Sequence, residues 1–219
     1  MERILAAEPG WQSAIADALA RLPRPIPLDE RLLPRMADGR PRPRPTDRTG
    51  FPPARAAATL LAIYPDPGGR LVIPLTVRRP DLRAHAGEVS LPGGAVDEAD
   101  ASVEAAALRE AWEEIGLRQE LVRVAGTLDA VWIPVSNFEL RPVVGTIDAR
   151  PELVPHDAEV AAIVELPVAA LFDPDVVGDE EFIVRGARIR AGAYRHAGLR
   201  VWGATALTLG MLAHALSAE

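Results

Sequence analysis

The sequence contains no cysteine and no lysine, and each absence excludes a class of chemistry. Without cysteine there is no disulfide framework, no thiol nucleophile and no cysteine-ligated zinc. Because every basic residue is arginine, catalysis through a lysine Schiff base is also excluded. No apolar run reaches the roughly 18 residues of a membrane span, and polar residues interrupt the N-terminal apolar positions, which is not typical of a signal peptide. We therefore expect a cytoplasmic protein with no membrane partner.

The balance of charge narrows the partners further. The formal charge is −7, from 24 basic and 31 acidic residues, which argues against binding along a nucleic-acid backbone. Small anionic ligands stay compatible with this charge, because a pocket can be locally basic. The 219 residues, 48% of them apolar, suffice for one globular domain with an extension.

Proline separates the start of the chain from the rest. Residues 10–22 carry apolar side chains at helical spacing, which predicts an amphipathic helix. Residues 23–53 are rich in proline, which removes amide donors and opposes a regular helix or a central strand. We interpret this stretch as an extended arm or wrap ahead of the domain; a linker without a role is the alternative.

From residue 54 onward the pattern is mixed α/β. Strands are predicted at 54–65 and 71–78, joined by the turn DPGG, and further strands at 121–132, 138–148, 159–168 and 180–186. A helix is predicted at 101–115, ended by Gly116, and a closing helix at 201–216. These elements predict an α+β fold in which a mixed sheet lies between helices.

Three glutamates crowd one side of the first of these two helices. Glu110, Glu113 and Glu114 stand at i, i+3 and i+4, where like charges repel by roughly 0.2–0.5 kcal/mol per pair. A solvated helix face tolerates that penalty, and a bound cation reverses it. Just upstream, Gly93 and Gly94 lie in a strand-to-helix connection, where a backbone without side chains can approach a ligand closely. Since Mg²⁺ binds carboxylates together with substrate phosphates, the pattern points to a metal and phosphate site.

Residues 94–117 resemble the Nudix box, G-x5-E-x7-R-E-U-x-E-E-x-G-U, where U is a bulky apolar residue. Asp100 stands in place of the first glutamate, and one extra residue precedes Arg109; both features are typical of the coenzyme A diphosphatase branch of that family. The segment 74–94 is similar to the upstream signature of this branch, L-L-T-x-R-[SA]-x3-R-x3-G-x3-[FW]-P-G-G. It matches the signature at Arg78, Arg83, Gly87 and Pro92, and it differs at Pro74, Arg79 and Leu91.

The resemblance implies a Nudix fold over residues 52–219, preceded by the helix and arm of residues 1–51. It implies that Mg²⁺ or Mn²⁺ is held by three carboxylates, those of Glu110, Glu113 and Glu114. Arg109 is implied to have a structural role, paired with Asp97 or Asp100. The general base is implied to be Glu113 or Glu159. Substrate is implied to contact five residues: Arg78, Arg83, Gly87, Gly93 and Gly94.

The implied reaction is hydrolysis of the diphosphate of coenzyme A or its derivatives to 3′,5′-ADP and 4′-phosphopantetheine, by attack of water on phosphorus. Two alternatives stay open: a Nudix hydrolase of another nucleoside diphosphate derivative, such as ADP-ribose, a dinucleotide or a nucleotide sugar, and a catalytically weak Nudix ligand sensor. The resemblance also favours a homodimer. The arginines of the signature have ion pairs to Asp81 or Glu88 as an alternative role. Trp112 is predicted to pack in the core rather than to stack on a ligand. Trp132 and Phe138 are also predicted to pack in the core, with lining of the acyl or pantetheine side of the substrate as the alternative.

Overall fold

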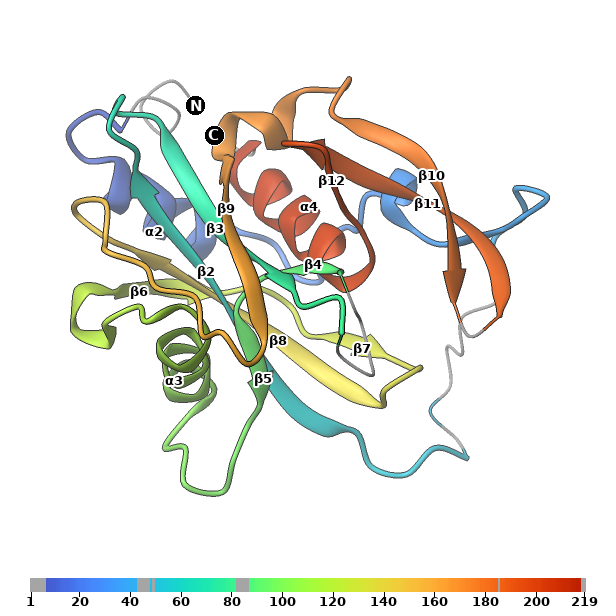
Figure 1. The fold of residues 1–219 in the computed structure, drawn as a ribbon. Helices are drawn as coiled ribbons and strands as arrows, with labels where there is room; N and C mark the ends of the chain where they lie inside the picture. Colours follow the sequence, from blue (N-terminus) through green and yellow to red (C-terminus); the bar gives the residue numbers. More distant parts are fainter. Residues whose placement is uncertain (1–6, 43–47, 49, 82–86, 185, 218–219) are drawn as a thin grey trace.

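A mixed sheet forms the centre of the computed structural model, which describes residues 7–42, 48, 50–81, 87–184 and 186–217 (Figure 1). Strand β2 runs parallel to β8, from Arg55 opposite Phe138 to Ile63 opposite Thr146, and the other pairings in this sheet are antiparallel. The strands of the sheet are β2 (Arg55–Pro65), β3 (Leu71–Arg78), β4 (Val89–Ser90), β5 (Gly93–Ala95), β6 (Arg123–Thr127), β7 (Val131–Ile133), β8 (Phe138–Thr146) and β9 (Val160–Pro167).

Strand β2 changes its second neighbour along its length. Ala57, Ala58 and Thr59 pair with β5, whereas Tyr64 and Pro65 pair with β3. Residues 87–92 pass through β4, which pairs with β3, and lead into β5. Here the Thr59 hydroxyl and the Leu60 amide both donate to the Pro92 carbonyl oxygen, at 2.7 and 2.9 Å. The two glycines of the strand-to-helix connection are thereby held at the centre of the sheet.

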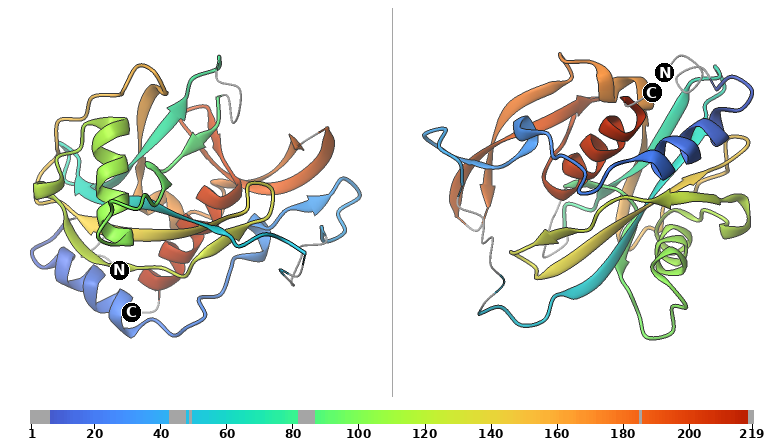
Figure 2. Two further views of the ribbon diagram at one scale, coloured as in Figure 1. Left: turned by 90° about the horizontal axis from the view of Figure 1, so that it is seen from below. Right: turned by 180° about the vertical axis from the view of Figure 1, so that it is seen from behind.

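Helices cover both faces of the central sheet (Figures 1 and 2). Helix α3 (Val103–Ile115) packs on one face, and α2 (Trp11–Arg21) and α4 (Gly203–Ser217) pack on the other. Leu60 and Tyr64 of β2 point into the core under α3, while Leu61 and Ile63 point into the core shared with α2 and α4. Because β2 is buried on both faces, it reads as a nearly continuous apolar run. The predicted mixed sheet between helices is confirmed.

Helix α3 begins and ends where its sequence provides caps. The Ser102 hydroxyl accepts a hydrogen bond from the Ala105 amide at 3.2 Å, so the helix starts at Val103, two residues later than predicted. Gly116 ends it in the left-handed conformation, with φ 65°, as glycine at this position commonly does.

The proline-rich arm packs against the rest of the molecule through its described part. The 3₁₀ helix η1 (Glu30–Leu32) inserts the fully buried Leu32 between β11 and α4, where a Cβ on Gly192 would lie 2.5 Å from the Arg31 carbonyl oxygen and one on Gly210 would lie 2.8 Å from the Leu32 side chain. Farther upstream, Arg24 forms an ion pair with Asp129, before β7. The arm is therefore a wrap in its described part; the division of the chain at residue 52 stays a prediction.

A second, antiparallel sheet lies beside α4. It contains β1 (Arg35–Met36) from the arm, β10 (Val177–Val184), β11 (Ala187–His196) and β12 (Leu199–Val201). Strand β11 was not predicted, because most of its residues are arginine, alanine and glycine, and only Ile189 and Tyr194 are of the β-branched and aromatic types typical of strands. The predicted strand 121–132 is divided into β6 and β7. Two further 3₁₀ helices complete the described elements: η2 (Gln119–Leu121) and η3 (Val168–Phe172). No helix in the described ranges is long and apolar enough to cross a membrane.

Candidate active site

The three glutamates of α3 differ strongly in exposure. Glu114 is only 7% exposed, the Glu110 side chain is largely covered, and the Glu113 side chain is more than half exposed. Burial raises the pKa of Glu114 to about 7, although the positive charge of Arg78 and a hydrogen bond from the Gly93 amide both act to lower it. Burial also raises the pKa of Glu110, against the opposing effect of its ion pair with Arg109. A buried carboxyl with so raised a pKa is typical of a functional site.

Gly94 lies directly against Glu110. A Cβ built on Gly94 would lie 2.6 Å from the Glu110 carboxylate, and one on Gly93 would lie 2.4 Å from the Ala58 carbonyl oxygen. At Gly93 the obstacle is backbone, so glycine is required there. At Gly94 the obstacle is the end of the flexible Glu110 side chain, which would have to move to admit a Cβ. Strand β5 thus passes close to α3 on one side and to β2 on the other.

Arg109 fastens the start of α3 to the loop before it. Its Nε and Nη2 donate to the two carboxylate oxygens of Asp100, both at 3.0 Å, and Nη2 also donates to the Ala95 carbonyl oxygen at 3.0 Å. Its Nη1 donates to Glu110 at 2.8 Å and to Glu113 at 3.3 Å. Asp97 is farther, at 3.7 Å. These contacts raise the pKa of Arg109 and lower the pKa of Asp100, so both groups stay ionised.

Arg78 and Glu159 complete the cluster from other elements. Arg78 ends β3, and its Nη2 lies 3.9 Å from a carboxylate oxygen of Glu159, just before β9. The loop that carries Glu159 is bound to α3 and β3 through its backbone, because the His156 amide donates to the Glu114 carbonyl oxygen at 2.9 Å and the Arg79 amide donates to the Glu159 carbonyl oxygen at 3.0 Å. The end of β3, β5, α3 and the loop 156–159 thus meet at one place.

The remaining residues singled out from the sequence fall in different surroundings. Gly87 has φ 70° and its amide donates to the Arg78 carbonyl oxygen at 3.2 Å, while Arg83 lies outside the described residues. Arg79 forms the predicted alternative ion pair, since its Nε and Nη2 bind the Asp81 carboxylate at 2.9 and 2.8 Å.

The prediction that three aromatic residues pack in the core was wrong for Trp112, which is 52% exposed. The face of α3 that packs on the sheet carries alanines and Ile115, and Trp112 lies off that face. Trp132 and Phe138 are only partly buried, where Trp132 contacts Phe51 edge-on with ring centroids 4.9 Å apart.

The carboxylates of the three α3 glutamates do not converge on a single point. Among the described residues, no three carboxylate or imidazole side chains form a ready-made metal site, because Glu110 and Glu113 are drawn to Arg109. Nevertheless, one oxygen of the buried Glu114 has no hydrogen-bond partner, and the Gly94 backbone lies directly against the Glu110 carboxylate. Oxygen donors of this kind suit Mg²⁺ or Mn²⁺, so the residues present fit such a cation.

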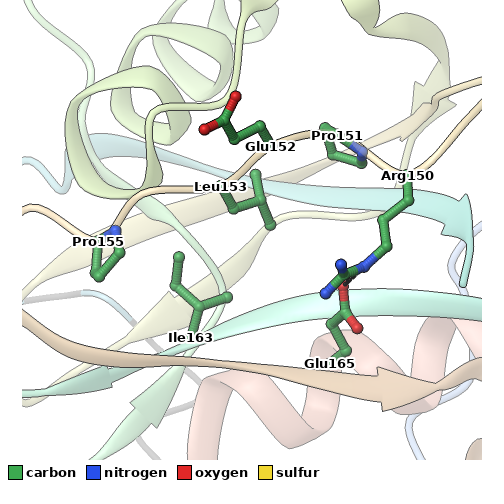
Figure 3. A pocket seen from close by; sticks show the side chains of 7 residues that line it. All are labelled: Arg150, Pro151, Glu152, Leu153, Pro155, Ile163 and Glu165. Carbon is green, nitrogen blue, oxygen red and sulfur yellow. Dashed lines mark hydrogen bonds and ion pairs between the residues drawn. The ribbon is translucent and has the colours of Figure 1, made fainter.

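A pocket of about 440 Å³ lies on the face of the central sheet that α3 covers, between the loop after β8 and strand β9 (Figure 3). Its lining residues are Arg150, Pro151, Glu152, Leu153, Pro155, Ile163 and Glu165. At its polar end, Glu165 accepts hydrogen bonds from the buried Tyr64 hydroxyl at 2.8 Å and from Arg150 at 2.9 Å. Sequence reasoning did not find this pocket, because its residues carry no recognisable spacing.

Comparison with known proteins identifies the family. Residues 53–185 match the NUDIX domain. The chain belongs to the Nudix family. It is 42% identical to the "Uncharacterized Nudix hydrolase NudL" of Cronobacter sakazakii over 158 residues, which is 69% of this chain and 78% of that protein, and 41% identical to the protein of that name from Klebsiella pneumoniae over 156 residues, with the same coverage. The crystal structure of a Nudix hydrolase from M. smegmatis, RenU, is 27% identical over 56% of this chain and 76% of that chain, with a TM-score of 0.46.

Membership of the Nudix family confirms the predicted Nudix fold and the prediction that the chain is a hydrolase. Nudix hydrolases act on derivatives of nucleoside diphosphates and generally use divalent metal ions. The glutamates of the Nudix box, Glu110, Glu113 and Glu114, therefore lie where the structure brings β3, β5 and the loop 156–159 together. The substrate and the roles of the individual residues are matters of proposal.

Proposed function

We propose that this Nudix hydrolase cleaves the diphosphate of coenzyme A or its derivatives to 3′,5′-ADP and 4′-phosphopantetheine. One observation supports the proposal most directly. Arg78, from the upstream signature, lies 3.9 Å from Glu159, and its charge acts to lower the pKa of Glu114 of the Nudix box, although 81 and 36 positions of sequence separate it from these two residues. The two motifs that resemble the coenzyme A diphosphatase branch thus contribute to a single site.

The metal-binding role falls to the carboxylates of α3. Mg²⁺ or Mn²⁺ bound by Glu110, Glu113 and Glu114 supplies polarisation of the phosphoryl oxygens and a lowered pKa for bound water. Arg109 keeps α3 and the loop of Asp97 and Asp100 in register through its ion pairs with both.

Of the two candidates for the general base, we propose Glu159 rather than Glu113. The Glu159 side chain is 54% exposed and lies on the loop beside Glu114, which supports a role in accepting a proton from water. The Glu113 carboxylate accepts a hydrogen bond from Arg109 Nη1 at 3.3 Å, and Glu113 carries a proposed metal-binding role as well.

Recognition of the diphosphate falls to the signature and to the glycine connection. Guanidinium groups bind phosphate oxygens in pairs, which suits Arg78 and Arg83 to this role. Gly87, Gly93 and Gly94 let the backbone approach the ligand without side chains. The 3′-phosphate of coenzyme A offers a further anionic group for these arginines.

The proposal is tested by a product assay in which coenzyme A, ADP-ribose, NADH and a diadenosine polyphosphate compete in the presence of Mg²⁺ or Mn²⁺. Mass spectrometry then identifies the products, with Glu114→Gln as the control for contaminating hydrolases. Dominant 3′,5′-ADP and phosphopantetheine support the proposal. Cleavage of another substrate instead overturns the coenzyme A assignment, and ligand binding without turnover across the panel favours the sensor.

Further proposals concern the compartment and the partners. We propose that the enzyme works in the cytoplasm and forms a homodimer. Its ligand is a small nucleotide, and it has no nucleic-acid or membrane partner. Light scattering of the full chain tests the dimer, and a monomeric mass contradicts it.

A further inference from the structure

One positive charge stands inside the group of carboxylates. Glu114 is buried, and burial raises its pKa most, with the charges of Glu110 and Glu159 adding to the effect. Arg78, whose Nη2 lies 3.9 Å from the Glu159 carboxylate, is the cation that acts in the opposite direction. A buried carboxylate without a counter-charge is costly. In the metal-free chain Arg78 therefore contributes compensation that a divalent cation would otherwise supply.

Within the described part of the chain, the polar contacts of the Arg78 guanidinium are weak. Its Nε is buried and has no hydrogen-bond partner, and its Nη2 approaches Glu159 only to 3.9 Å, which is an ion pair without a hydrogen bond. One oxygen of Glu114 is likewise buried and unpaired. The adjacent Arg79 differs sharply, because it is fastened to Asp81 by two short hydrogen bonds and to the Asp157 carbonyl oxygen by a third.

We propose that Arg78 is an internal counter-cation, which balances Glu114 and Glu159 while the metal site is empty and leaves them for the substrate phosphates once a divalent cation binds. The inference rests on the metal-binding role in the proposed function. In the metal-free chain the Arg78 guanidinium faces the carboxylates of Glu114 and Glu159. After a divalent cation has bound, the same guanidinium binds the substrate phosphates. Because a single and a double positive charge repel, Arg78 opposes metal binding as long as no substrate is present.

The first test measures Mn²⁺ binding to the full chain by calorimetry, after removal of metal with a chelator and without substrate. Arg78→Gln removes the charge and keeps a similar side-chain length, and Arg78→Lys keeps a positive charge. Arg79→Gln is the control, because it removes a charge one residue away that is paired with Asp81. We expect Arg78→Gln to bind Mn²⁺ roughly tenfold more tightly than the wild type, the scale of such a repulsion in a well-solvated site. Arg78→Lys and Arg79→Gln should bind as the wild type does. Unchanged or weaker binding by Arg78→Gln overturns the inference.

The second test measures thermal unfolding, which does not depend on metal affinity alone. Metal-free Arg78→Gln should unfold at a lower temperature than the wild type, and Mn²⁺ should raise its unfolding temperature more. In a Glu114→Gln background the Arg78→Gln change should cost much less, since the carboxylate that it balances is gone. An equal loss in both backgrounds shows that Arg78 stabilises the strand in another way, and it overturns the inference. Even if the single variant fails to fold without metal, the double variant is expected to fold.

The outcomes also separate this inference from the proposed function. If the wild type and Glu114→Gln both fail to bind Mn²⁺, the metal site is wrong and the proposed function fails with it. If the wild type binds Mn²⁺, Glu114→Gln does not, and Arg78→Gln binds like the wild type, the metal site stands and only the counter-cation role is overturned.

Discussion

Arg109 and Asp100 form a two-point ion pair, with Nε to Oδ1 and Nη2 to Oδ2 both 3.0 Å apart. The pair joins the second turn of α3 to the loop that follows β5, and the same guanidinium reaches Glu110 through its remaining nitrogen. A planar, two-pronged contact fixes orientation as well as distance. The position of the Glu110 carboxylate therefore depends on a residue that need not touch the substrate.

We predict that Arg109→Lys destabilises the chain by about 1–3 kcal/mol, because lysine keeps the charge but cannot make the paired contact. Asp100→Asn should cost a similar amount, and the double variant should cost much less than the sum of the two. Urea unfolding of the metal-free proteins measures these free energies. Additive losses would show that the two side chains stabilise the fold independently of each other.

The Glu114→Gln variant should keep its fold and lose most of its hydrolytic rate. Glutamine has nearly the same shape but cannot supply the charge that a divalent cation requires, and we expect kcat to fall by about 100-fold or more, beyond the usual loss for a residue that only supports a metal ligand. Steady-state kinetics at saturating Mn²⁺ measures the loss, and circular dichroism checks the fold. Near wild-type turnover would contradict the metal-binding role of Glu114.

Gly94→Ala should reduce activity with little loss of stability. The added Cβ would lie 2.6 Å from the Glu110 carboxylate, so that side chain must turn away, and a flexible glutamate can do so at small cost to the fold. A matched control is Gly68→Ala, in the turn between β2 and β3, where the added Cβ meets the side chains of Asp66 at 3.2 Å and Arg70 at 3.9 Å. We expect Gly94→Ala, but not Gly68→Ala, to bind Mn²⁺ more weakly than the wild type. Equal Mn²⁺ affinity in the two variants would show that metal binding does not depend on the position of the Glu110 carboxylate beside Gly94.

Periodicity and punctuation in the sequence were enough to predict α3, its end at Gly116 and the buried strands β2 and β3. The contact between Arg78 and Glu159 could not be predicted in the same way, because it depends on how β3 and β9 pair rather than on any local spacing. The exposure of Trp112 was missed for a related reason. Helical spacing shows which residues share a face, but alanine rather than tryptophan fills the narrow space between α3 and the sheet.

The arm should contribute to the stability of the whole chain. Leu32 is fully buried between Gly192 and Gly210, and truncating a buried leucine to alanine typically costs about 2–5 kcal/mol. We therefore expect Leu32→Ala to lower the free energy of unfolding by that amount in a single cooperative transition. Chemical unfolding followed by tryptophan fluorescence tests this, with the exposed Leu121→Ala as a control. A loss below about 0.5 kcal/mol, as for a surface substitution, would mean that the arm is a dispensable linker.

The stability of the metal-free protein should fall as the pH rises from about 4.5 to about 7. The pKa of Glu114 is raised from 4.5 in the unfolded chain to about 7 in the folded one, so within this range the folded state holds a proton that the unfolded state has lost. Below the range both states are protonated, and above it the full cost of the buried charge is present, up to about 3 kcal/mol. Glu114→Gln removes the titrating group, so the difference in unfolding free energy between the variant and the wild type should grow across this range and then level off. Urea unfolding at pH 5 and pH 8 in a chelator measures it. A difference that is the same at both pH values would show that Glu114 titrates alike in the folded and unfolded chain, and that its burial is compensated fully by Arg78 and the Gly93 amide.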